Sequence, residues 1–283
     1  MPQTRTASMG CTAMPTHFRR RSARFPAAVN GAVVKAAAHK VVWVYAVAAD
    51  LDPDQLSGLT GVGGERVRVV TAADLSAVVG TVDAAAFGED SLRDLLTDVD
   101  SIQTLGRAHH QVVASIASDG PVVPLRLATV YPDDATVRAL LAEHRTDLAE
   151  LLQALNGTQE WGVKVYMELS GDGSHGDPCA APAGAPAGLA EQQPRWQRAE
   201  ACAEEIDAAL SGLAIAARRH PTPYLGVEDS DGWILLNGTY LLDADRAAEF
   251  AGIAQSLIDE HAALWAQVTG PWPPYSFVDR QDA

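Results

Sequence analysis

Two adjacent histidines, His109 and His110, are the first candidates for chemistry, because an imidazole can bind a metal ion or transfer a proton near neutral pH. Helical metal sites need histidines four residues apart and a further ligand, whereas neighbours in a helix point to different faces. His109 falls on a stripe of apolar residues. We therefore predict that it is a hydrogen-bonded core residue, and we expect the same of His144.

A glycine-rich stretch, Gly58 to Gly64, and an acidic stretch, Glu228 to Gly232, resemble ligand-binding loops. A dinucleotide loop needs GxGxxG directly between a strand and a helix, but these glycines come well after one strand and precede another. The spacing of a calcium loop would place a ligand at Val227, and no glutamate closes the loop downstream. We predict a surface turn at Gly58–Gly64 and no bound cation or cofactor at either stretch.

Other motifs of enzymes are missing from the sequence. It contains no GxSxG and no GK[ST], and its three cysteines, Cys11, Cys179 and Cys202, are too scattered for a metal site or a disulfide framework. Such cysteine usage suits a reducing cytoplasm. With 36 carboxylates present, acid–base pairs are possible, but nothing selects two of them. We predict no catalytic residue, no metal and no cofactor.

The charge of the 283-residue chain is unevenly distributed. The formal net charge is −15, yet residues 1–40 hold seven basic and no acidic side chains, so residues 41–283 carry −22. An acidic chain is a poor partner for nucleic acid, and no apolar run reaches the roughly 20 residues of a membrane-spanning helix. We expect neither partner. The basic leader is either an extension outside the fold, with Met14 as another possible start, or an arm that docks on an acidic surface.

Hydrophobic periodicity predicts the elements that position these residues. Short β-branched and aromatic runs indicate strands, and apolar residues three or four apart indicate helices. Strands are expected at 41–47, 66–70, 75–82, 122–130, 163–169 and 233–242, and helices at 92–116, 134–155, 196–217 and 245–268. The strand at 41–47 is apolar throughout, so both of its faces should be buried.

The order of these elements favours an α+β fold over a doubly wound sheet, because strands and helices do not alternate strictly. We expect two lobes, each a small, mostly antiparallel sheet with helices on one face. The predicted domains are a disordered basic extension (1–39), an N-terminal α+β domain (40–158) and a C-terminal α+β domain (159–278), followed by a tail (279–283). Gly, Pro and Ala dominate residues 171–194, which predicts a flexible loop inside the second domain.

The segment Gly270 to Val278 combines three prolines with three aromatic residues. Prolines restrict the backbone, and aromatic side chains offer a large contact area at low entropic cost. The segment is either a rigid tail that packs back onto the sheet or a strip that binds a partner, as in proline-rich recognition. Its candidate binding residues are Trp272, Pro273, Pro274, Tyr275 and Phe277.

Four stretches resemble the gas vesicle protein F/L family: TGPWPPYSFV at the end, GPVVPLRLATVYPDDATVRALL from Gly120, LNGTQEWGVKVYMEL from Leu155 and LLNGTYLL from Leu235. The resemblance runs in order from about Val41 to Val278 and does not separate F from L members. It implies a buried arginine at Arg126. Two family patterns differ here: a His-Glu pair reads His109-His110, and a Phe-Gly-Thr reads Leu127-Ala128-Thr129.

This resemblance also implies two α+β lobes, the N-terminal one ferredoxin-like, and a non-enzymatic accessory protein of gas vesicles. Such a protein would be a minor vesicle component that binds the hydrophobic shell protein, limits its aggregation and assists nucleation and assembly. Its partners would be the shell protein and other accessory proteins, in the cytoplasm during assembly and then at the vesicle, a cytoplasmic organelle. The alternative is a small-molecule-binding or enzymatic α+β protein on the same fold, which a well-formed apolar cavity with convergent polar groups would favour.

Overall fold

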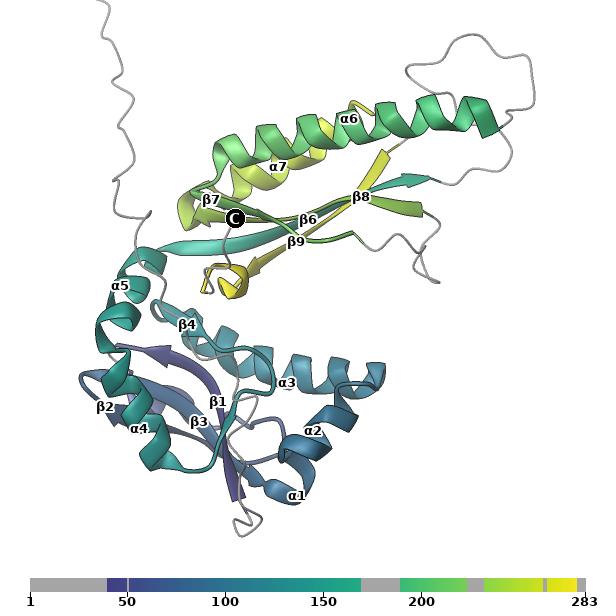
Figure 1. The fold of residues 1–283 in the computed structure, drawn as a ribbon. Helices are drawn as coiled ribbons and strands as arrows, with labels where there is room; N and C mark the ends of the chain where they lie inside the picture. Colours follow the sequence, from purple (N-terminus) through teal and green to yellow (C-terminus); the bar gives the residue numbers. More distant parts are fainter. Residues whose placement is uncertain (1–39, 50, 169–188, 223–231, 262–263, 279–283) are drawn as a thin grey trace, which may run out of the picture.

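The computed structural model describes residues 40–49, 51–168, 189–222, 232–261 and 264–278 (Figure 1). They form two antiparallel sheets with helices. The strands are β1 (Lys40–Ala48), β2 (Val67–Ala72), β3 (Leu75–Asp83), β4 (Val122–Pro124), β5 (Val130–Tyr131), β6 (Thr158–Glu168), β7 (Ala216–Arg219), β8 (Gly232–Asp243) and β9 (Leu264–Trp272). The helices are α1 (Ala84–Phe87), α2 (Glu89–Leu95), α3 (Val99–Ala117), α4 (Asp134–Glu143), α5 (Arg145–Leu155), α6 (Leu189–Leu213) and α7 (Ala247–Asp259), with 3-10 turns η2 (Pro53–Leu56), η3 (Ala244–Arg246) and η4 (Tyr275–Phe277).

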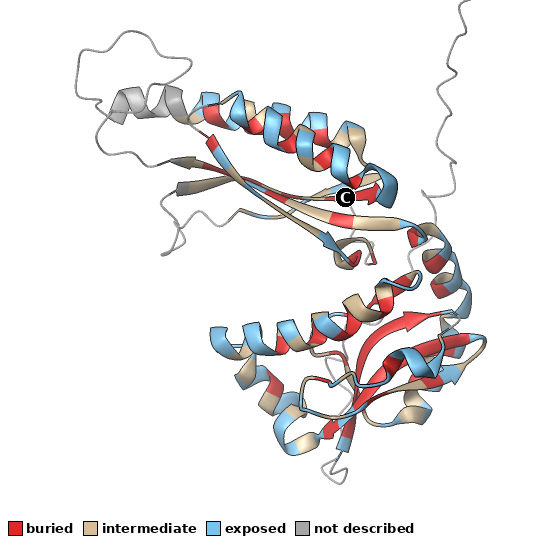
Figure 2. Cartoon of the chain, turned by 180° about the vertical axis from the view of Figure 1, so that it is seen from behind, coloured by how far each residue is buried: buried red, intermediate tan, exposed pale blue. Residues whose placement is uncertain are grey.

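The N-terminal sheet has the strand order β2-β3-β1-β4, and β5 also pairs with β1. Every residue of β1 after Lys40 is buried, which confirms the prediction that both faces of this strand are covered (Figure 2). Side chains of α4 and α5 pack on one face of the sheet, and those of α2 and α3 pack on the other. The expectation of helices on one face only is therefore wrong for this lobe, because two amphipathic segments follow β3 and each needs a sheet face to bury its apolar stripe.

The helix predicted at 92–116 is broken. Asp98 begins α3 by accepting a hydrogen bond from the Ser101 amide at 2.8 Å, so the chain turns between α2 and α3. As a result Val99 is 65 % exposed, although the apolar spacing predicts that it is buried. The helix predicted at 134–155 is likewise divided into α4 and α5 at His144, which is half-buried instead of lying in the core.

The C-terminal sheet has the order β7-β8-β6-β9, and its elements follow the βαββαβ sequence of ferredoxin-like folds. The N-terminal sheet has the equivalent strand order, with η2 and the glycine-rich loop where the first helix would stand. The ferredoxin-like pattern is thus complete in the C-terminal lobe. Both helices of this lobe, α6 and α7, lie on one face of its sheet (Figure 1).

Three predicted bounds in the C-terminal lobe are wrong. The helix expected to reach Val268 ends at Asp259, and Leu264 to Trp272 form β9 instead. The helix expected at 196–217 begins earlier, at Leu189 inside the expected loop 171–194, and ends earlier, at Leu213. The strand β7 follows it, and the sequence pattern does not predict this strand. Residues 171–188 of that loop and Glu228 to Asp231 of the acidic stretch lie outside the described residues. The domain bounds at 40, 158 and 278 stay a prediction.

Candidate functional site

The C-terminal segment after β9 joins the two lobes. Strand β9 pairs with β6 as far as Glu160 and Trp272, and Gly270 allows the close approach of the two strands. Its φ is +139°, and a Cβ there would lie 2.9 Å from the Trp161 ring and 3.1 Å from the Glu160 carbonyl oxygen. Only glycine fits this backbone, so the strand can bend and lead the chain from the C-terminal sheet to the N-terminal lobe.

Beyond the bend, the segment packs into both cores of the N-terminal lobe. Tyr275 contacts the core between β1 and α3, whereas Phe277 and Val278 contact the core under α4 and α5. Leu241 of β8 lies in the latter core as well. The lobes therefore share apolar side chains: the segment packs inward, as the rigid-tail alternative expects, but against the N-terminal lobe and not back onto its own sheet. Binding of a partner by this segment stays a prediction.

A buried carboxylate, Glu160, holds the segment in place. It is 6 % exposed and accepts hydrogen bonds from the amide and the hydroxyl of Ser276, both at 2.7 Å. Burial raises the pKa of Glu160, while the bonds from Ser276 and the charge of Arg218 oppose that rise. The guanidinium of Arg218 also lies over the Phe277 ring, 5.8 Å from its centroid.

The predicted binding residues do not share one environment. Pro273 and Pro274 are buried, Tyr275 and Phe277 are half-buried between the lobes, and Trp272 is 39 % exposed beside His110, with the ring centroids 4.9 Å apart. Arg126 is exposed, contrary to the expectation that it is buried. It lies on the loop between β4 and β5, where its carbonyl oxygen accepts a hydrogen bond from the Thr129 hydroxyl at 2.7 Å. Of the strip, Trp272 is the side chain that offers surface to a partner.

Sequence reasoning missed a second exposed aromatic residue, Trp265. It stands on β9 opposite Tyr166 of β6, and the two rings stack at 4.0 Å with 5° between their planes. Trp265 is 39 % exposed, because its face of the sheet is the one that α6 and α7 leave uncovered. The alternation of Leu264, Ala266 and Val268 toward the helices could have identified this strand and the outward tryptophan.

His109 is the hydrogen-bonded core residue that the sequence predicts. It is 3 % exposed, accepts the indole N–H of Trp43 at Nδ1 (3.0 Å) and donates from Nε2 to the Leu125 carbonyl oxygen (3.0 Å). These bonds need the neutral ring with its proton on Nε2. Burial accordingly lowers the pKa of His109 to about 4. The group therefore serves the structure of the lobe, because both of its nitrogen atoms are already bonded.

The glycine-rich stretch forms a turn, as predicted. A Cβ at Gly61 would lie 2.2 Å from the Tyr45 hydroxyl, which binds the Glu65 carboxylate and accepts the Val62 amide at 2.9 Å. This loop is thereby attached to β1. In the part of the chain that the structure describes, no group of three His, Cys, Asp or Glu side chains could hold a metal ion, and no helix is long and apolar enough to cross a membrane.

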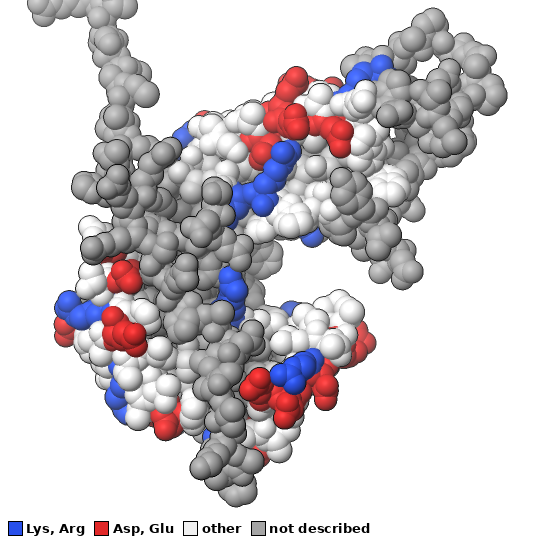
Figure 3. Space-filling model, in the orientation of Figure 1, with Lys and Arg blue, Asp and Glu red and all other residues white. Residues whose placement is uncertain are grey.

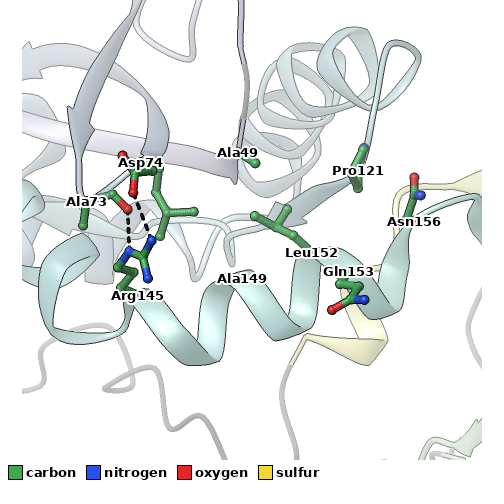
Figure 4. Close-up of a pocket in the computed structure, with 10 residues that line it drawn as sticks. Ala49, Ala73, Asp74, Pro121, Arg145, Ala149, Leu152, Gln153 and Asn156 are labelled. Carbon is green, nitrogen blue, oxygen red and sulfur yellow. Dashed lines mark hydrogen bonds and ion pairs between the residues drawn. The ribbon is translucent and has the colours of Figure 1, made fainter.

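A hollow of about 460 Å³ lies between α5 and the β2–β3 turn (Figure 4). The charged residues that line it, Asp74 and Arg145, bind each other at 2.9 Å, and Arg145 also donates to the Ala73 carbonyl oxygen at 3.1 Å. Ala73 and Asp74 both have positive φ, of 53° and 61°, as a two-residue type I′ hairpin requires. The ion pair between Asp74 and Arg145 thus stabilises a hairpin turn, and these two side chains do not converge on a ligand.

Comparisons with known proteins agree with this architecture. The family model "Gas vesicle synthesis protein GvpL/GvpF" matches residues 41–279. Gas vesicle protein L of Streptomyces sp. (strain CB03234) is 34 % identical over 84 % of this chain and 93 % of its own length, and gas vesicle protein F of the same strain is 30 % identical over 84 % and 99 %. The crystal structure of GvpF from Anabaena sp. PCC7120 has the same fold, with a TM-score of 0.63, 17 % identity and coverage of 86 % of this chain and 98 % of that one. The chain therefore belongs to the GvpL/GvpF family of gas vesicle synthesis proteins.

Proposed function

We propose that this protein is a gas vesicle accessory protein that binds the hydrophobic shell subunit, limits its aggregation and so assists nucleation and assembly of the vesicle. Family membership supports a role in gas vesicles. The observation that supports the binding is the pair of exposed tryptophans on β9, Trp265 and Trp272. Aromatic side chains of this kind provide most of the binding energy in many protein interfaces.

The surroundings of the two tryptophans suit an apolar partner. Both belong to the strand at the edge of the C-terminal sheet, and Trp265 stands on the sheet face that carries no helix. The space-filling view shows the surface hollowed between this lobe and the N-terminal lobe (Figure 3). A partner that enters there would cover apolar surface, while the net charge of −22 on residues 41–283 would keep the complex in solution.

The test measures light scattering when denatured shell subunit is diluted into buffer. Added protein should suppress scattering in proportion to its molar ratio, without nucleotide, and salt should reduce the effect only weakly, because screened charges contribute mainly to the association rate. The double variant Trp265→Ala/Trp272→Ala should lose most of the suppression. Trp196→Ala is the matched control, since Trp196 is a half-buried tryptophan of α6 on the other side of the sheet.

Two outcomes would contradict the proposal. One is unchanged scattering at a molar excess of the protein. The other is suppression that depends on ATP, which would indicate an energy-driven reaction instead of stoichiometric binding. Equal loss of suppression in the double variant and in the Trp196→Ala control would contradict the assignment of the binding surface to β9.

A further inference from the structure

A surface hollow in the N-terminal lobe lies between α1, α2 and the beginning of α3. Its volume is about 620 Å³, and it is lined by the apolar residues Ala86, Phe87, Leu95 and Leu105 together with Asp94 and Asp100. Apolar side chains that line a surface hollow of this kind can bind an apolar group.

The charge around this hollow is strongly acidic. Residues 83–104 contain six carboxylates and one basic side chain, Arg93. Arg93 already pairs with Glu89 and Asp90, at 3.1 Å and 3.2 Å. Hydrogen bonds from Ser101 lower the pKa of Asp98, which is therefore charged at neutral pH. Acidic side chains gather over α2 and the tip of α3 (Figure 3). The complementary ligand is a segment that combines aromatic with basic side chains.

We propose that this hollow binds residues 18–25 of the same chain, whose sequence is FRRRSARF. Two phenylalanines frame four arginines in this segment, and the whole of residues 1–39 has six basic and no acidic side chains. A phenylalanine side chain enters the apolar hollow, and the arginines face Asp94 and Asp100. The segment matches the hollow in both polarity and charge.

The attachment point of the leader supports this occupant over a second molecule. Lys40, where the described chain begins, pairs with Asp83 across β1 and β3, with Lys40 Nζ 3.7 Å from the Asp83 carboxylate. Asp83 is also the N-cap of α1, and Ala86 and Phe87 of α1 line the hollow. The chain between Phe25 and Lys40 can span roughly 50 Å, which is ample for so near a site. Tethering gives an effective concentration on the order of millimolar, so a contact whose Kd lies below that concentration is mostly occupied.

This inference is independent of the proposed function, because the leader lies outside the residues that match the family and no residue of β9 lines the hollow. The test uses the full chain and measures how fast trypsin cuts after Arg19 to Arg24. A docked leader resists cutting. The variant Asp94→Asn/Asp100→Asn should be cut about fivefold faster, as expected for the loss of two exposed charge contacts. The control Glu204→Gln/Glu205→Gln changes two exposed carboxylates of α6 and should be cut at the original rate.

A second measurement keeps the hollow intact. Phe18→Ala/Phe25→Ala leaves every trypsin site in place and should also speed the cutting, while hydrogen exchange of the amides in Glu89–Leu105 becomes faster. Equal cutting rates in the original chain and both variants would overturn the proposal. Protection that grows with protein concentration would overturn it too, since the occupant would then come from a second copy of the chain.

Discussion

The buried imidazole of His109 predicts how the stability of the protein changes with pH. Its pKa is about 4 in the folded chain and 6.5 without the protein environment. Between these values the unfolded chain binds more protons, so stability is complete above pH 6.5 and falls as the pH decreases toward 4. At about 1.4 kcal/mol per pKa unit, the full loss is about 3 kcal/mol, and about 2 kcal/mol of it is lost by pH 5.

The assay is urea unfolding at pH 8 and at pH 5, followed by tryptophan fluorescence, for the original protein and for His109→Gln. A glutamine can accept the Trp43 N–H and donate to the Leu125 carbonyl oxygen, but it does not titrate. We expect the stability difference between the two proteins to shrink by about 2 kcal/mol from pH 8 to pH 5.

A control variant, Val112→Ala, removes two fully buried methyl groups from α3, the helix that also carries His109, and removes no titrating group. It should lose stability equally at both pH values. If the curves of the original protein and His109→Gln stay parallel from pH 8 to pH 5, the reasoning about this imidazole is refuted.

Other predictions concern the backbone and the lobe junction. Ala128 has a φ of +65°, at the position where the family pattern has glycine, so Ala128→Gly should raise the free energy of unfolding by about 0.5–1 kcal/mol. Ala149→Gly, in the exposed face of α5, should lower it by a similar amount, and urea unfolding measures both. Tyr275→Ala should cost about 3 kcal/mol and Trp272→Ala only about 1 kcal/mol, because the tyrosine is packed between the lobes whereas the tryptophan is partly exposed. Equal losses would show that Trp272 is an anchor of the fold.

The parts of the fold that local pattern determines could be predicted. The β-branched and aromatic run Val41–Val47 is typical of a strand covered on both faces, and His109 follows the buried stripe of α3. Leu264 and Val268 are four residues apart, which places them on one face of a helix and equally on one face of a strand. This spacing therefore predicts a C-terminal helix that is too long. Strand β7 has no large apolar residue and was missed for that reason.

The side chains that stay exposed for a partner were harder to predict, since their exposure depends on packing between segments that are far apart in sequence. The composition of Gly270–Val278 identified an unusual segment, but only the folded lobes determine that Tyr275 is packed inward and Trp272 is not. Likewise, Leu96 and Val99 have the spacing of buried residues and are exposed because the cap at Asp98 reorients the helix.

The position of Val278 in the core under α4 and α5 has a consequence for synthesis on the ribosome. A domain at the beginning of a chain can usually fold while the rest is still being made. Here the N-terminal lobe lacks Leu241, Phe277 and Val278 until translation has passed Val278, on the order of ten seconds after α5 is complete. During that interval its apolar core stays partly open, so the nascent lobe depends on these three distant residues before it can close.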